Sequence, residues 1–454
     1  MRVRILSFVR QEENTRKEEI MSSRSIAAVT LALALPFMAC EAGTDEAATG
    51  GAAGTAGTAG YRFPREPGTT PDGYPLPLTG EPITKTPVIA EAGVSVREYP
   101  EHYIPGQERL AEDEMRITAC GSWGPAPLRI GQGASCLLVE LGNDDVFIFD
   151  IGGGTVGNLF ALGVHPARLD KVFITHFHLD HVGGIFPLFD AMGWARNTPL
   201  HVWGSSGYTP ELGITAFAQN IREASEWHIQ NKQSILPMGG MTIVPHEVDI
   251  SKFSPKHPRE LAYDENDVKI YAFPVIHALA GSMGYRLEWN GLTLVYTADS
   301  QPSTFEAEHG KGADVFIHEI FPSAEEFAHY NHMPIEAAYG VMEEHTTPAE
   351  LGRVYTIAKP RLGVGMHFTL DDDLIDPLFQ RWSTTYDDPV LLMQDLTTIN
   401  VTSDYIVVRQ TNADLLAWPA VPPKPPEGVD MTPGEPSKAQ RPSWLTETRL
   451  PQEP

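Results

Sequence analysis

Residues 172–186 read VFITHFHLDHVGGIF, an apolar run that ends in a cluster of metal-binding side chains. Four of these, His176, His178, Asp180 and His181, fall within six positions. Alternate residues of an extended segment point the same way, so the first two histidines should project together from a strand end, and the other pair should come from the turn beyond. Imidazole and carboxylate groups hold zinc and similar divalent ions. The stretch therefore predicts two adjacent metal positions.

The flanks of this cluster predict how the chain passes through it. Residues 172–175 read as a buried strand, and Gly183 and Gly184 allow close backbone packing before a helix at about 184–194. The alternative is a chance cluster of solvated histidines in a loop. Ligand spacing and flanking strand agree, which favours the metal site.

The composition fits a globular enzyme and disfavours nucleic acid as a partner. The chain has 454 residues, of which 42% are apolar and 20% are charged. Its 33 basic and 59 acidic residues give a formal charge of -26, which would repel polyanions unless a basic patch intervened. The sequence contains no basic run of that kind.

The chain start predicts an exported protein, with a signal peptide within residues 1–40 and Met21 as an alternative start. After Met21, one Arg precedes an apolar stretch and a small residue before Cys40, which is the layout of a secretory signal. Ala39 and Cys40 also resemble a bacterial lipoprotein cleavage site, although Phe37 stands where Leu is usual. The protein is then either periplasmic or anchored to the membrane through a lipid on Cys40. A fatty-acid label that disappears in Cys40→Ala would separate these alternatives.

Composition shifts divide the rest of the chain into four segments. Residues 41–60 form a Gly/Ala-rich linker, and residues 61–112 form a Pro-rich arm that lies on the domain or is partly disordered. Residues 113–412 form the catalytic domain. Residues 413–454 contain ten prolines and are a linker or a surface strap, because such a segment cannot form a core.

Two further cysteines, Cys120 and Cys136, lie on neighbouring predicted strands at about 115–120 and 134–141. In an exported protein they could form a disulfide, and two separately buried thiols are the equal alternative. Neither has the spacing of a zinc-binding cysteine pair.

Later strands also end in ligand-type side chains. Three strands are expected within residues 268–302, with His277 after the first and Asp299 after the third. A buried strand ends in HEI, which contains Glu319, and another ends at His367. A helix is expected to begin in the HTT segment at His345, with Thr346 or Thr347 as its N-cap and Pro348 in its first turn. Ligands at strand ends share one rim of a sheet, where rigid elements fix their geometry.

The order of these motifs resembles the metallo-β-lactamase fold superfamily, whose HxHxDH signature stands here as HFHLDH. The resemblance covers about residues 113–410. The HE and HTT segments are similar to those of the ribonuclease Z and arylsulfatase-like branch, although TAD replaces its TGD turn. The resemblance implies an α/β fold, the four-layered αβ/βα sandwich, with a dinuclear metal site, and a dimer is plausible on the same ground.

The resemblance also implies roles for individual residues. The first metal would take His176, His178 and His277, the second would take Asp180, His181 and His367, and Asp299 would bridge the two. Asp150 resembles the superfamily's structural Asp beneath the metals and is not expected to be a ligand. The cofactors would be two divalent metal ions, with zinc favoured and manganese or iron as alternatives.

In this scheme a metal-bridging hydroxide attacks the substrate, and Asp180 belongs to the catalytic set as a ligand. His345 would supply a proton to the leaving oxygen, and Glu319 would hold its imidazole. For Glu319 and His345 the alternative is purely structural bonding.

Three function classes compete. The favoured one is an exported hydrolase of a phosphate or sulfate ester of a small molecule, a phosphodiesterase or an arylsulfatase-like enzyme. Within the same class, a ribonuclease Z-like endoribonuclease is an alternative. The second class is a lactonase or β-lactamase-type hydrolase of a cyclic ester or amide. The third is a purely structural metal domain, which predicts missing ligands, and none is missing. His277 and Asp299 are only 22 residues apart, which leaves no room for the long basic arm of many ribonucleases Z. The insertion at 205–265 either selects the substrate or serves as a packing cap.

Overall fold

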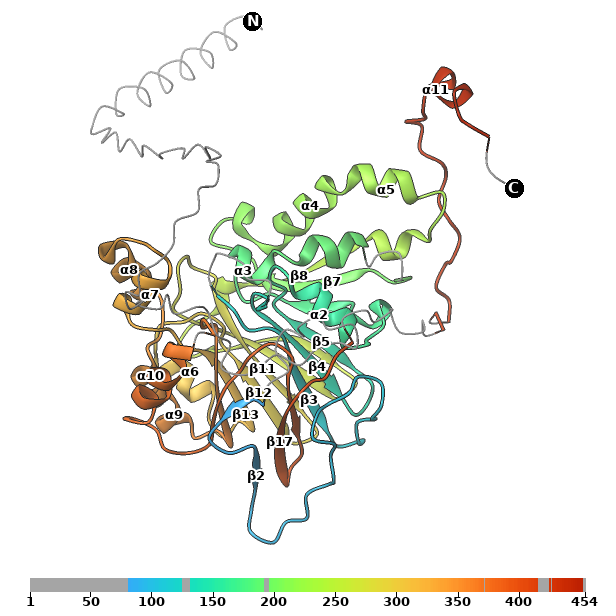
Figure 1. Ribbon diagram of the computed structural model, residues 1–454. Helices are drawn as coiled ribbons and strands as arrows, with labels where there is room; N and C mark the ends of the chain where they lie inside the picture. Colours follow the sequence, from blue (N-terminus) through green and yellow to red (C-terminus); the bar gives the residue numbers. More distant parts are fainter. Residues whose placement is uncertain are drawn as a thin grey trace, which may run out of the picture. The chain divides into compact units, whose positions relative to one another are not determined.

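Two mixed β-sheets organise the fold (Figure 1). The computed structural model describes residues 81–124, 131–191, 196–370, 372–414, 424–425 and 427–451. The signal region at 1–40 with Cys40, the linker at 41–60 and the first part of the Pro-rich arm lie outside these residues. Among the described helices, none is long and apolar enough to cross a bilayer.

The first sheet has nine strands in the order β2-β17-β16-β3-β4-β5-β6-β7-β8. The strands from β3 to β5 form an antiparallel meander, whereas β5, β6, β7 and β8 are parallel. Their bounds are β2 Val88–Ala90, β3 Met115–Gly121, β4 Cys136–Leu141, β5 Val146–Phe149, β6 Lys171–Phe173, β7 Leu200–Ser205, β8 Ile243–Val248, β16 Thr397–Val401 and β17 Tyr405–Gln410.

The second sheet has eight strands in the order β1-β15-β14-β13-β12-β11-β10-β9. It repeats the same plan, because β9 to β12 form an antiparallel meander and β12 to β15 are parallel. Their bounds are β1 Ile83–Thr84, β9 Glu260–Glu265, β10 Val268–Pro274, β11 Met283–Trp289, β12 Leu292–Tyr296, β13 Val315–Glu319, β14 Leu362–Met366 and β15 Val390–Leu392.

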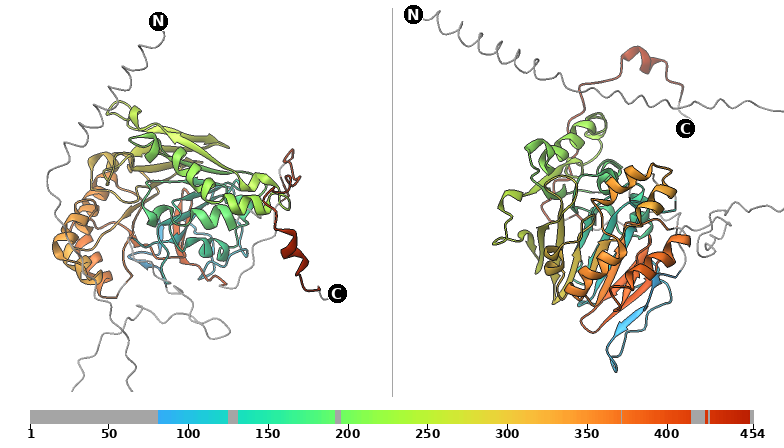
Figure 2. Two further views of the ribbon diagram at one scale, coloured as in Figure 1. Left: turned by 90° about the horizontal axis from the view of Figure 1, so that it is seen from above. Right: turned by 90° about the vertical axis from the view of Figure 1, so that its left-hand side faces the viewer.

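Helices cover the outer face of each sheet, which gives four layers (Figures 1 and 2). One set packs with the nine-stranded sheet and comprises α2 Thr155–Ala161, α3 Leu179–Val182, α4 Ile214–Ala224 and α5 Glu226–Lys232. The other set packs with the eight-stranded sheet and comprises α6 Thr304–His309, α9 Pro348–Ala358 and α10 Asp372–Trp382. Two further helices, α7 Ala324–Tyr330 and α8 Ile335–Met342, pack on each other.

The side-chain alternation of a strand explains this layering. On β5, Phe147 and Phe149 join the core between the two sheets, whereas Val146 and Ile148 join the core beneath α2. Successive residues of a strand point to opposite faces, so a continuous apolar run supplies both cores. The expected four-layered αβ/βα sandwich is therefore the observed fold.

Residues 81–112 of the Pro-rich arm lie on the domain and extend both sheets. Within this segment, β1 pairs with β15 and β2 pairs with β17 (β2 is drawn in blue). Glu108 anchors the arm, because its carboxylate binds the buried guanidinium groups of Arg116 and Arg409. The arm therefore docks through both backbone pairing and a charged cluster.

The C-terminal tail contacts the insertion at 205–265. Gln233 donates from its side chain to the carbonyl of Glu435, and Ser437 donates to the side chain of Gln230. The tail ends in the short helix α11 Ser443–Glu447. Its described residues thus include a surface strap beside the end of α5.

One local expectation was wrong. Asp180 and His181 lie on α3, a short helix, and not in a turn. The helix expected from about residue 184 is present, because residues 185–186 are helical and continue into a π-helical turn at Pro187–Ala191, where this described segment ends. Cys120 and Cys136 are buried free thiols in this structure.

Candidate metal centre

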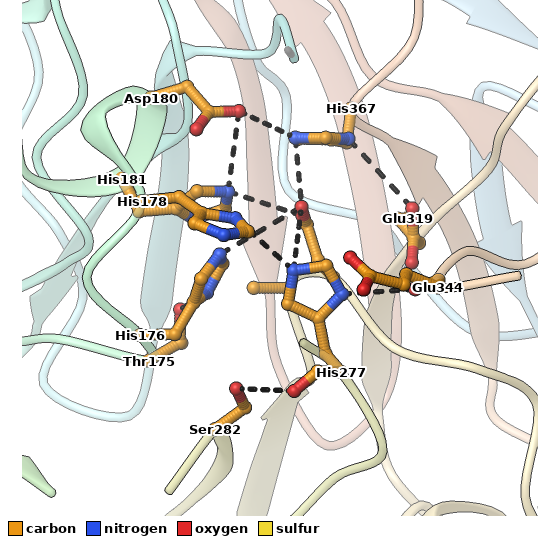
Figure 3. A network of polar contacts seen from close by, with 12 residues as sticks. Thr175, His176, His178, Asp180, His181, His277, Ser282, Glu319, Glu344 and His367 are labelled. Carbon is orange, nitrogen blue, oxygen red and sulfur yellow. Dashed lines mark hydrogen bonds and ion pairs between the residues drawn. The ribbon is translucent and has the colours of Figure 1, made fainter. Parts of the chain in front are cut away.

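The candidate site lies where strand ends of both sheets meet (Figure 3). In the nine-stranded sheet, β6 leads to His176 and His178, and α3 carries Asp180 and His181. The eight-stranded sheet contributes His277 after β10, Asp299 after β12, Glu319 at the end of β13 and His367 after β14. Residues far apart in the sequence thus converge on one rim.

The first ligand group contains His176, His178, His277 and Asp299, and one ligand atom from each lies within 4.8 Å of the others. His178 Nδ1 is 3.3 Å from His277 Nε2. Asp299 Oδ2 lies 3.8 Å from His277 Nε2 and 4.0 Å from His176 Nε2. These separations leave the donor atoms around a common point.

The second group contains Asp180, His181, His367 and again Asp299. Oδ1 of Asp299 is 3.2 Å from His181 Nε2 and 3.2 Å from His367 Nε2. Asp180 Oδ2 is 3.2 Å from His367 Nε2 and 3.8 Å from His181 Nε2. Asp299 therefore offers one carboxylate oxygen to each group, as a bridging ligand would.

The donor atoms fit divalent cations. His176 Nε2, His181 Nε2 and Asp299 Oδ1 are buried and lack a hydrogen-bond partner within the described residues. Burial lowers the pKa of His176 well below its usual range, which keeps the imidazole in its neutral, ligating form. Burial also lowers the pKa of His181, but the charges of Asp299, Asp150 and Asp180 outweigh it and raise that pKa well above normal. The site therefore attracts positive charge.

Asp150 holds the His181 ring from behind. Its Oδ2 lies 2.8 Å from His181 Nδ1 and accepts a hydrogen bond from Tyr296 Oη at 2.9 Å. Thr175 donates to the same carboxylate from its backbone N–H and its hydroxyl. With Nδ1 bound to Asp150, Nε2 of His181 faces the second group. Asp150 is thus beneath the ligands, where the sequence resemblance put it.

Backbone groups orient two other histidines. His277 Nδ1 is 3.0 Å from the carbonyl of Glu344, and Ser282 Oγ donates to the carbonyl of His277. The backbone N–H of His367 donates to the carbonyl of Ser122, and His367 has a φ of 65°. A left-handed conformation at a non-glycine residue is uncommon and agrees with a constrained functional position.

Two glycines are required by close approach to the site. A Cβ on Gly124 would lie 1.7 Å from His367 Nε2, and a Cβ on Gly152 would lie 2.2 Å from the carbonyl oxygen of Asp180. Any side chain at either position would displace a ligand-bearing segment. The glycine-rich turn at 152–154 therefore allows the segment that carries the ligands to approach closely.

Glu319 and His345 form a buried pair beside the ligand groups. Glu319 Oε2 lies 2.6 Å from His345 Nδ1, and Glu319 Oε1 accepts from the backbone N–H of Ser300 at 2.5 Å. The His345 ring stacks on Phe321 at a centroid distance of 4.1 Å. Burial lowers the pKa of His345, whereas burial and the charge of Asp299 raise the pKa of Glu319 well above normal. The raised pKa of Glu319 favours its carboxyl form, and the pair lies next to Asp299.

The helix that follows this pair begins as the sequence predicts. Thr347 is the N-cap of α9 and Pro348 is its first residue. The side chains of Thr347 and Glu350 complete a capping box, which fixes the point where the segment carrying His345 enters the helix.

The structure brings together all the residues that the sequence placed at the site: His176, His178, Asp180, His181, His277, Asp299, Glu319, His345 and His367. Other histidines lie elsewhere. His201 contacts His246 at 2.9 Å, and His309 stacks on Phe273. The sequence analysis missed the supporting groups, namely the carbonyl of Glu344, the N–H of Ser300 and the hydroxyl of Tyr296.

Comparisons with known proteins agree with this geometry. Residues 129–326 match the family model described as Metallo-beta-lactamase superfamily. A ribonuclease Z of Thermococcus gammatolerans is 26% identical over 234 residues, which cover 45% of this chain and 72% of that protein. A ribonuclease Z of Thermococcus kodakarensis is 28% identical over 211 residues, which cover 38% of this chain and 63% of that protein, less than two thirds of its length.

Among solved structures, the short form of human tRNase Z aligns over 63% of this chain and 98% of that one, with 19% identity and a TM-score of 0.47. The two sheets and the match to the family model define the fold.

Proposed function

Because the chain belongs to the metallo-beta-lactamase superfamily and is a metal-dependent hydrolase, we propose that it cleaves phosphodiester bonds at a centre for two divalent metal ions, with zinc favoured over manganese or iron. The ions would be held by His176, His178 and His277 on one side, by Asp180, His181 and His367 on the other, and by Asp299 between them. When bound, they would supply an activated water and neutralise charge on the phosphoryl group.

One observation carries the proposal, the buried pair of Glu319 and His345. The bond breaks faster when the departing oxygen gains a proton or a charge partner. With Nδ1 of His345 bound to Glu319, Nε2 is the ring nitrogen that remains for the substrate. Nε2 gives its proton to the leaving oxygen, and the carboxyl group of Glu319 maintains the tautomer and position of the ring.

The relatives named ribonuclease Z support phosphodiesters above the sulfate esters and lactones that the sequence left open. They also favour a ribonuclease Z-like reaction on RNA over hydrolysis of a small molecule. A small phosphodiester remains the second candidate for one reason. The connection from β10 to β11 spans only residues 275–282 and contains no Lys or Arg, so it provides no basic arm there.

The test compares purified zinc-loaded protein on four substrates: a precursor tRNA, bis-p-nitrophenyl phosphate, p-nitrophenyl sulfate and a simple lactone. We expect cleavage of one or both phosphodiesters. Cleavage of only the sulfate or only the lactone would contradict the proposal.

His345→Ala should lower kcat by about 10²- to 10⁴-fold, the range for loss of a general acid, and leave the bound zinc unchanged. His257→Ala is the matched control, because His257 is exposed and outside the centre. Zinc content is measured by atomic absorption beside the kinetics. Loss of zinc in His345→Ala would place His345 among the ligands and refute its role as a proton donor.

A further inference from the structure

A cavity of about 250 Å³ opens beside the metal centre. His176 and His178 line it and also belong to the first ligand group. The remaining wall comes from residues 278–282 after His277 and from the segment that enters α4. A substrate held at the metals would therefore extend directly into this cavity.

Apolar side chains form much of the cavity wall. Phe177 lies between the two histidines in sequence, and its ring centroid is 5.3 Å from that of Phe217 on α4. Leu212 and Leu279 also line the cavity, yet they are 49% and 69% exposed. Large apolar side chains that remain exposed around a concave site are typical of a ligand surface. An apolar cavity of about 150 Å³ holds benzene, so this one has room for an aromatic ring.

The lining of the cavity offers no Lys or Arg side chain to an anionic group. Apart from the two histidines, Glu211 is the one ionisable residue among the described lining residues, and no Lys or Arg is present there. Nucleic acids are held chiefly by cationic contacts to their phosphates. An additional anionic group placed in this cavity, away from the two histidines, would meet the Glu211 carboxylate and no cationic side chain of the lining.

The cavity wall is fixed by backbone packing. Gly281 has a φ of 117°, and a Cβ there would lie 2.5 Å from Ser205 Oγ at the end of β7. The loop after His277 is thus pressed against the nine-stranded sheet. It holds Leu279 on the cavity wall that α4 completes.

We infer that this cavity binds an uncharged aromatic group attached to the scissile phosphate, so that the preferred substrate is an aryl ester or a similarly apolar phosphodiester. This inference rests on the proposed phosphodiesterase function and narrows it to the second candidate named there, a small phosphodiester. It assigns substrate selection to Phe177, Phe217, Leu212 and Leu279, and it assigns rejection of anionic groups to Glu211. The insertion at 205–265 then selects the substrate through the short helix η4 Pro210–Leu212 and through α4, and does not serve only as a cap.

The test is equilibrium binding of non-hydrolysable phosphonates to zinc-loaded full-length protein, by isothermal titration calorimetry. Phenylphosphonate should bind at least about tenfold more tightly than methylphosphonate, because the ring leaves water for an apolar wall. Phe217→Ala should remove most of that preference and leave methylphosphonate affinity unchanged. Trp227→Ala is the control, because Trp227 is an aromatic residue of the neighbouring α5 that is 81% exposed and does not line the cavity.

A charged probe tests Glu211. Phosphonate carrying a 4-carboxyphenyl group should bind several-fold more weakly than phenylphosphonate, and Glu211→Gln should reduce that difference. Equal affinities for the phenyl and methyl compounds would overturn the inference, and hydrolysis of bis-p-nitrophenyl phosphate would show whether the proposed function survives. If neither phosphonate binds and no phosphodiester is cleaved, both fail.

Discussion

At the scale of single residues, Asp150 links the metal centre to the core. It is fully buried and its carboxylate contacts His181, Thr175 and Tyr296. A carboxylate behind a ligating histidine fixes the ring and makes its free nitrogen a better ligand. The acidic partner therefore contributes to metal affinity without touching the metal.

Asp150→Asn should weaken zinc binding about 10- to 100-fold, the usual cost of losing such a partner. The amide also presents an N–H group where the carboxylate accepts hydrogen bonds, so Thr175 or Tyr296 loses a hydrogen-bond acceptor. Zinc affinity is measured by competition with a chromophoric chelator. Tyr296→Phe is the control, because it removes one donor and keeps the carboxylate, and its loss of affinity should be smaller. An unchanged affinity in Asp150→Asn would contradict the argument.

The sequence predicted the ligands better than their supports, and the reason is chemical. His176, Asp180 and His367 are recognisable because imidazole and carboxylate groups have few structural reasons to cluster at strand ends. The carbonyl of Glu344 and the N–H of Ser300 could not be predicted, because every residue carries those groups. Their roles follow only from the folded backbone.

At the scale of elements, the structure shows the conformation of the arm formed by residues 81–112, which the sequence left open. Prolines made its conformation unpredictable, since a segment without periodicity can be extended on a surface or disordered. Without the arm, β15 and β17 would be edge strands with unpaired backbone groups. In the structure, β1 pairs with β15 and β2 pairs with β17. Long-range pairing of this kind leaves little local pattern in the sequence.

Glu108→Gln should destabilise the domain by about 2 kcal/mol, because it removes the anion that two buried guanidinium groups share, while Arg116 keeps its ion pair with Glu140. The side chains of Arg116 and Arg409 are each 4% exposed. Lys85→Gln is the matched control, since the ion pair of Lys85 with Asp387 is exposed and should contribute less than about 0.5 kcal/mol. Urea unfolding measures both. Equal effects of the two changes would refute the role of the buried cluster.

Glu108 should also make the stability of the domain depend on pH. Burial raises the pKa of Glu108, but its hydrogen bonds with Arg409 and the charges of Arg409 and Arg116 outweigh burial, so its pKa lies below the ordinary 4.5. The folded state therefore favours the carboxylate. Its stabilising contribution is complete above about pH 4.5 and is lost as the pH falls through the lower, folded pKa. The difference in unfolding free energy between wild type and Glu108→Gln should accordingly shrink in acid.

At the scale of the whole molecule, the metal centre joins the two sheets. His176 and His181 belong to the nine-stranded sheet and its helix α3, whereas His277, Asp299 and His367 belong to the eight-stranded sheet. The overall architecture could be predicted because the ordered motifs of both halves agreed with one fold. The stability of the junction between the two sheets could not be predicted, since it depends on how closely the ligand-bearing rims of the sheets approach each other.

Removing the metals should therefore loosen the whole domain. Ligands that bind only the folded state stabilise it by about 2.7 kcal/mol at a concentration of 100 Kd, so chelation should lower Tm and abolish hydrolysis, and added zinc should restore both. Differential scanning calorimetry with and without EDTA measures the effect. His176→Ala, which lacks one ligand, should show a smaller response to EDTA, whereas His257→Ala should respond like wild type. A wild-type Tm that does not change with EDTA, in protein shown to have lost its zinc, would mean that apolar packing between the sheets suffices and that the metals serve only the chemistry.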